Sequence, residues 1–89
     1  MGWEPRGFDA ALSVWEETCS PTSSEMRLVL EWIGELLDDP EDTSTTVYIE
    51  TTSATRVGCA PGTTVLMRYT LDGDRRRLIA HVIVTVPED

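Results

Sequence analysis

The chain of 89 residues contains no lysine, only one histidine and only two cysteines. Cys19 and Cys59 show no CxxC spacing, and a single histidine adds too few ligands for a zinc site. We therefore expect two reduced thiols that act as small buried hydrophobes, with no metal and no cofactor. No apolar run approaches the roughly 18 residues of a membrane span, and the N-terminus lacks the cationic start and apolar core of a signal peptide. These absences predict a cytoplasmic protein that makes no use of a membrane.

Charge is distributed unevenly along the chain. The formal net charge is -9, and all seven basic residues are arginines. Residues 1–50 hold twelve acids against two arginines, whereas residues 51–89 hold four acids against five arginines. A global charge of this sign repels phosphate backbones, so contact with RNA requires a local basic patch. A basic protein partner would instead be attracted.

The first half of the chain predicts two helices. Apolar residues at helical spacing indicate a first helix over residues 8–19, which Ser20-Pro21 ends. The sequence TSSE at residues 22–25 is a capping box, so a second helix is expected at about residues 23–38. This second helix is too apolar to lie alone on a surface, so two of its faces are buried or one is an interface. Trp32 lies off its main apolar stripe, which leaves a homodimer through this helix open.

From Thr45 onward the apolar period changes from 3.6 to 2, which indicates strands. We expect four strands, at about residues 45–52, 54–59, 63–71 and 76–86. The predicted fold class is α+β in a single domain, residues 1–89. Its two N-terminal helices pack on one face of a three- to four-stranded antiparallel sheet.

Alternation along the last two strands predicts which side chains face the helices. One face holds Val65, Met67, Tyr69, Leu71, Leu78, Ala80, Val82, Val84 and Val86. The opposite face holds Leu66, Arg68, Thr70, Arg77, Ile79, His81, Ile83 and Thr85. A four-residue loop from Asp72 to Arg75 would set Arg68 opposite Ile79 and Tyr69 opposite Leu78. Because this second face mixes apolar and basic side chains, we interpret it as an interface or a shallow cleft.

Basic side chains gather around the last hairpin. In the segment DGDRRR, residues 72–77, two aspartates lie near the arginines, so we expect a solvated and partly self-neutralised hairpin tip. Arg68 and His81 are different, because they project from the same face of adjacent strands. A neutral histidine beside an arginine can act as a base near pH 7. The alternative is a sheet-face histidine with a local hydrogen bond.

Three segments carry a resemblance to a known family: WEP at residues 3–5, LLDDP at 36–40, and RVGCAPGTTVLMRYTLDGDRRRLIAHVIV at 56–84. Together with the order of two helices followed by a hairpin, they resemble the RelE/ParE superfamily of small toxins from bacterial toxin–antitoxin pairs. The resemblance implies a first strand that pairs with the sheet before the two helices. Only MGWEP precedes the first helix here, so that strand should be very short or absent.

The resemblance also implies an activity, since the ribosome-dependent endoribonucleases of this family position messenger RNA with basic and aromatic residues of the sheet. This chain departs from that pattern. The arginine expected after the glycine that opens the third strand is replaced by Thr63-Thr64, the expected aromatic falls at Met67, and the tail TVPED lacks the late histidine. Arg68 and His81 could form a substitute catalytic pair for RNA on the ribosome. The missing arginine instead favours a diverged, catalytically silent relative.

Two functions therefore remain open. The first is a toxin-fold protein whose partner is an antitoxin. The second is an acidic, non-enzymatic protein-binding regulator or nucleic-acid mimic that presents carboxylates to a basic target. The acidic run that includes Asp38 and Asp39 is otherwise expected to be a solvated turn. The expected binding residues are Leu66, Arg77, Ile79 and Ile83 on the sheet, with Trp32, Asp38 and Asp39 on the helical side.

Overall fold

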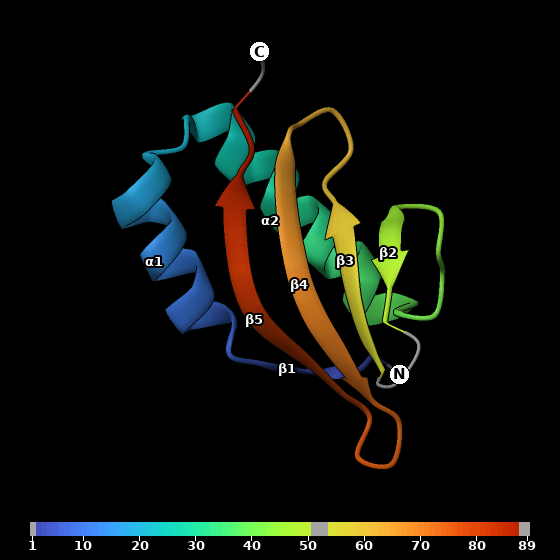
Figure 1. Ribbon diagram of the computed structural model, residues 1–89. Coiled ribbons are helices and arrows are strands. Elements are labelled where there is room, and N and C mark those ends of the chain that lie inside the picture. The colour runs from blue at the N-terminus through green and yellow to red at the C-terminus, as the bar shows by residue number, and fades with distance from the viewer. Residues whose placement is uncertain (1, 51–53, 88–89) are drawn as a thin grey trace.

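The computed structural model describes residues 2–50 and 54–87. Within these residues a short strand comes first, two helices follow, and four further strands come after them. The elements are β1 (Glu4–Arg6), α1 (Phe8–Cys19), α2 (Ser23–Asp38), β2 (Thr46–Ile49), β3 (Thr55–Cys59), β4 (Val65–Asp72) and β5 (Arg77–Thr85). Figure 1 shows α2 behind the sheet and α1 alongside β5. The broad face of the sheet that points toward the viewer is covered by neither helix, and we call it the open face.

In the described part of the chain the sheet has five strands, in the order β1-β5-β4-β3-β2. β1 runs parallel to β5, whereas the other neighbours are antiparallel. The predicted α+β class is confirmed, but the sheet is mixed and has five strands rather than three or four antiparallel ones. The additional strand is β1, which has only three residues and therefore too short a pattern to be recognised by alternation.

Both helices have the predicted bounds. The capping box of α2 forms, since the Glu25 amide donates to the Thr22 hydroxyl and the Thr22 amide donates to the Glu25 carboxylate, each at 3.1 Å. Gly7 connects β1 to α1 with a φ of 75°, and a Cβ there would lie 2.5 Å from the Ala80 carbonyl oxygen. Glycine is required at this position because it allows both the left-handed backbone and the close contact with β5.

One hydrophobic core joins both helices to the sheet. Its buried residues are Phe8, Ala11, Trp15, Val29, Trp32, Ile33, Leu36, Ala60, Val65, Met67, Tyr69, Leu78, Ala80 and Ile83. The two buried indoles also satisfy their polar groups: Trp15 donates to the Thr85 hydroxyl and Trp32 to the Thr45 hydroxyl, each at 2.9 Å. These bonds fix α1 against β5 and α2 against the segment that leads into β2.

The strands are slightly shorter than the sequence predicts, except that β4 continues to Asp72. The predicted strand over residues 45–52 is observed as Thr46–Ile49, and residues 51 and 52 lie outside the described part of the chain. The loop between β4 and β5 has four residues as expected, but it runs from Gly73 to Arg76.

A β-bulge in β5 changes which side chains face the helices. Tyr69 lies opposite Ala80, and the next residue back along β4, Arg68, lies opposite Val82, so His81 is the additional residue. The predicted pairs of Arg68 with Ile79 and of Tyr69 with Leu78 are wrong, because the loop begins one residue later than predicted and so shifts the pairing by two residues, and the bulge shifts the pair of Arg68 by one more. Beyond the bulge the alternation is shifted by one position. As a result Val82, Val84 and Val86 are exposed, whereas the prediction placed them in the core.

Candidate functional site

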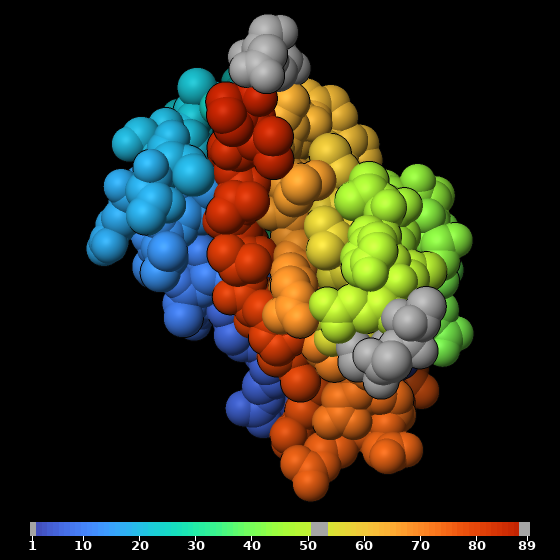
Figure 2. All heavy atoms as spheres, viewed as in Figure 1, coloured from blue at the N-terminus to red at the C-terminus, as the bar shows by residue number. Residues whose placement is uncertain are grey.

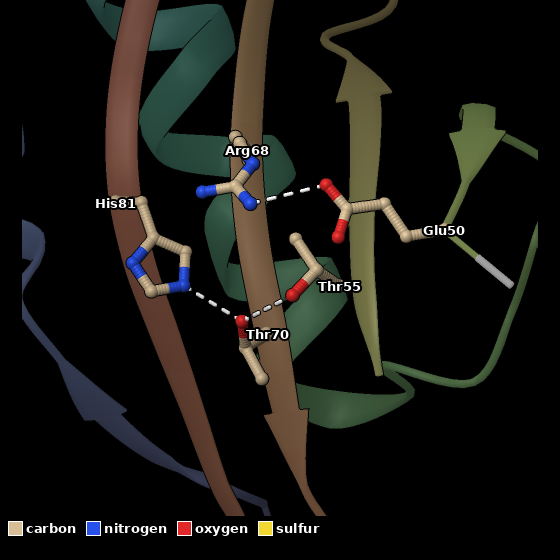
Figure 3. Close-up of polar contacts among 5 residues, drawn as sticks. All are labelled: Glu50, Thr55, Arg68, Thr70 and His81. Atoms are coloured by element: carbon tan, nitrogen blue, oxygen red, sulfur yellow. Dashed lines mark hydrogen bonds and ion pairs between the residues drawn. The ribbon is translucent and has the colours of Figure 1, made fainter. Parts of the chain in front are cut away.

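The open face brings Arg68 and His81 together on adjacent strands, as the sequence predicts (Figure 3). Arg68 projects from β4, and His81 is the bulged residue of β5. Both side chains are exposed. The cation and the candidate base that RNA cleavage would need thus lie on one surface, although each already has a partner within the chain.

Arg68 is held by an acidic side chain at the end of β2. Its Nη2 lies 3.0 Å from Oε1 of Glu50, and both side chains are partly exposed, at 45% and 31%. At such exposure water screens the attraction, so this pair contributes at most about 1 kcal/mol to stability. Its effect on the site is larger than its effect on the fold, because the Glu50 carboxylate repels any phosphate that approaches Arg68.

His81 is the first member of a chain of polar contacts. Its Nε2 lies 2.7 Å from the Thr70 hydroxyl, which lies 2.9 Å from the Thr55 hydroxyl. Thr55 is buried although it belongs to the open face, with 6% of its surface exposed. One imidazole nitrogen is therefore bound to the sheet. This local hydrogen bond is the arrangement that is the alternative to a catalytic role for His81.

Apolar side chains surround these polar contacts. Val82 and Val84 of β5 are each 40% exposed, and Tyr48 of β2 is 60% exposed. Leu66 and Ile79 are half-buried on the same face. In Figure 2 the face is seen as atoms, with β5 in red on one side of β4 and β2 in light green on the other. The mixture of exposed valine, tyrosine and paired charges is typical of a protein-binding surface.

An apolar groove lies at one border of the open face, between α1 and β5. Its volume is about 210 Å³, and its lining residues are Gly7, Ala10, Ala11, Val14, Ala80, His81, Val82 and Ile83. Small side chains on α1 leave this space beside the bulge. His81 therefore lies where the polar contacts meet the groove.

Two predicted binding residues belong to the core instead. Ile83 is 1% exposed, because the bulge at His81 turns it toward the helices. Trp32 is 2% exposed, and its indole packs against Gly58. The prediction that Ile83 lies on the open face is therefore wrong, and Trp32 is part of the core-facing side of α2 rather than off its apolar stripe. Arg77 stays at the surface, where its Nε lies 3.1 Å from the Glu4 carboxylate, an ion pair that joins β5 to β1.

The acidic candidates Asp38 and Asp39 lie at the C-terminal end of α2 and are exposed. They line a groove of about 390 Å³ together with Trp3, Pro40, Glu41, Gly73 and Arg76. The guanidinium of Arg76 lies 5.9 Å from the centre of the Trp3 ring, a cation–π contact between the hairpin tip and the N-terminal segment. The hairpin tip is solvated, as predicted.

Cys59 lies opposite Leu66 on the open face, whereas Cys19 ends α1. Cys19 and Cys59 are free thiols and half-buried. A hydrogen bond from the Thr85 backbone, and a second from the Thr18 hydroxyl, lower the pKa of the Cys19 thiol. Within residues 2–50 and 54–87 no three His, Cys, Asp or Glu side chains are grouped as a metal ion would require.

The sequence did not identify Glu50 or Thr55 as members of the site. Glu50 follows a four-residue edge strand, and Thr55 begins the next strand after the undescribed residues 51–53. Neither position carries a motif. Their approach to Arg68 and Thr70 depends on the pairing of β3 with β4, which no local pattern indicates.

Comparison with protein-family models, with curated proteins and with solved structures found no match to this chain. In the part of the chain that the structure describes, neither helix has the length and apolar character that crossing a membrane would take.

Proposed function

We propose that this chain is a cytoplasmic RelE/ParE-like protein of a toxin–antitoxin system that is catalytically silent and acts by binding another protein. The ion pair between Arg68 and Glu50 carries this proposal. Cleavage of RNA needs a cation for the negative charge that develops at phosphorus. The cation beside His81 is already neutralised by a carboxylate at 3.0 Å.

Two further features support the proposal. β1 pairs with the sheet before the two helices, which is the arrangement that the RelE/ParE resemblance implies. The open face also exposes Val82, Val84 and Tyr48 next to the paired charges, which suits contact with an antitoxin-like protein better than contact with a phosphate backbone.

The test is induced expression of the intact protein in a bacterial host, with growth and protein synthesis measured in vivo. We expect the natural sequence and the Arg68→Ala variant to leave both rates unchanged. A growth arrest that occurs with the natural sequence and disappears with Arg68→Ala would show an active toxin and contradict the proposal.

A second candidate is an acidic, non-enzymatic regulator or nucleic-acid mimic that binds a basic protein. The carboxylates that favour it belong to α2 and the loop that follows: Glu25, Glu31, Glu35, Asp38, Asp39, Glu41 and Asp42. Among the described residues these side chains form no ion pair, since the three ion pairs involve Glu4 and Glu50 instead. Their charge therefore remains available to attract a basic partner.

This candidate predicts a complex that depends on ionic strength. The double variant Asp38→Asn with Asp39→Asn should weaken the complex with a basic partner protein, and added salt should weaken it further. A complex of unchanged affinity between low and high salt would rule out the electrostatic form of this function.

A further inference from the structure

Gly34 is a glycine in the interior of α2 for which the fold gives no packing reason. It is exposed, and a Cβ added to it would meet no atom within 4 Å. Glycine inside an exposed helix is less favourable than alanine, and it is normally kept where another backbone approaches closely. No segment that the structure describes makes such an approach to Gly34.

Gly34 belongs to a short seam on α2, in which Leu30 and Gly34 are exposed and Leu37, at one end, packs against the core. Leu30 lies one turn earlier and is 48% exposed, and Leu37 lies one turn later and is half-buried. The spacings of four and three residues are those of the d, a and d positions of a heptad repeat. Such a seam is the surface on which a second helix packs, and a glycine at its centre allows the two helices to approach closely.

Carboxylates mark one border of this seam. Glu31 and Asp38 directly follow Leu30 and Leu37 in the sequence, so they occupy the two e positions of the same heptads. Both are exposed and form no ion pair with a described residue. Charges at e positions select the partner helix, and the two acids there select basic residues across the seam from Leu30 onward, whereas the exposed Arg27 at the preceding a position repels them.

We propose that the Leu30/Gly34 seam of α2 is the docking site for a basic amphipathic helix of a partner protein. This inference rests on the second candidate function, the acidic regulator, and specifies its partner as a helix with leucine-like residues facing Gly34 and lysines or arginines facing Glu31 and Asp38. The N-terminal segment crosses the end of α2, where the Trp3 amide donates to the Leu37 carbonyl at 2.8 Å. The contact therefore centres on Leu30 and Gly34.

The test uses the intact protein and two synthetic peptides of three heptads. Both peptides have leucine at a and d; one has lysine at e and g, and the other has glutamate there. Binding is measured by calorimetry at concentrations at which each peptide alone is monomeric. We expect binding of the lysine peptide, weaker at high salt, and no binding of the glutamate peptide. Absence of binding to the lysine peptide would overturn the inference.

Gly34→Gln separates docking from helix stability. Glutamine is a better helix former than glycine and adds neither charge nor an apolar contact, so the Tm should rise by about 3–6 °C. Binding should nevertheless weaken about tenfold, because the side chain blocks close approach. Ser13 is an exposed position of α1, so Ser13→Gln is the matched control and should bind normally. Unchanged binding by Gly34→Gln would overturn the inference.

A matched pair of charge variants tests the register of the seam. Glu31→Gln removes an e-position charge and should weaken binding about 2–5-fold, whereas Glu17→Gln removes an exposed charge of α1, away from the seam, and should have no effect. Equal losses in the two variants would mean general attraction to the acidic surface. That result would overturn the inference that a helix docks at the Leu30/Gly34 seam. It would not contradict the second candidate function, the acidic regulator.

Discussion

Gly58 lies in β3, where the indole of Trp32 from α2 packs against the sheet. A Cβ at this position would lie 2.7 Å from the ring of Trp32 and 3.3 Å from the ring of Tyr69. Both rings are buried, so neither can move without disturbing the core. The absence of a side chain at Gly58 is thus what allows Trp32 to reach the Thr45 hydroxyl.

Gly58→Ala should therefore destabilise the protein by about 1–3 kcal/mol, the usual cost of an overpacked core. Gly73→Ala is the control, because a Cβ there meets no atom within 4 Å. Urea unfolding followed by circular dichroism measures both. Equal stability of the two variants would show that the core around Trp32 adapts to the added methyl group.

Cys19 differs from an ordinary thiol because the Thr85 backbone and the Thr18 hydroxyl lower its pKa. In a Cys59→Ala background, the alkylation rate of Cys19 should rise with pH through a midpoint below that of the same protein in denaturant. The lowered pKa stabilises the fold above the unfolded pKa of the thiol, and this contribution is lost as the pH falls through the folded value. Identical midpoints in the folded and unfolded protein would refute the hydrogen-bond assignment.

At the scale of elements, the bulge in β5 has the largest effect on the site. It places both His81 and Val82 on the open face and returns Ile83 to the core. Removing the additional residue leaves a regular strand in which Ala80 and Ile83 still face the helices. At His81, therefore, one residue can be removed from β5 without moving core side chains to the open face.

Deletion of His81 should accordingly preserve the fold, at a cost of about 1 kcal/mol for the lost hydrogen bond to Thr70. Deletion of Ile79 is the control, because it brings His81 into the core position of Ala80, and it should unfold the protein or lower its Tm far more. Thermal unfolding of both variants provides the measurement. A His81 deletion as damaging as the Ile79 deletion would mean that the bulge itself is needed for the fold.

The same bulge explains how much of the structure the sequence could predict. The helix bounds follow from local signals, namely apolar spacing and the Thr22 capping box, and they are confirmed. Arg68 and His81 share a face even though the predicted register is wrong, because the hairpin shifts the pairing by two residues, which preserves the face of a strand, and the bulge changes the alternation only after His81. Ile83 was misplaced because nothing in the local sequence marks the bulge. Glu50 was missed because its contact with Arg68 depends on long-range strand pairing.

At the scale of the whole molecule, repulsion between like charges opposes folding. The net charge is -9, and the three ion pairs among the described residues are all partly exposed. Exposed pairs contribute little, so screening should remove more repulsion than attraction. The acidic half of the chain therefore makes stability dependent on ionic strength.

Raising sodium chloride from about 20 mM to about 200 mM should increase the Tm by a few degrees, since the Debye length falls well below the size of the molecule. Calorimetry at a fixed pH near 7 measures the change. A variant with Asp38→Asn and Asp39→Asn should respond less, because it has fewer charges to screen. A Tm that falls with salt would show that the ion pairs outweigh the repulsion.

The three tryptophans make the folding of this chain visible by optical spectroscopy. Trp3 lies next to β1 under the Arg76 guanidinium, Trp15 is buried in α1, and Trp32 is buried in α2. Each of the three N-terminal elements thus has its own fluorophore in a distinct environment. Variants that retain a single indole would report separately when the first strand, α1 and α2 dock onto the sheet, so the order of assembly can be followed without an added label.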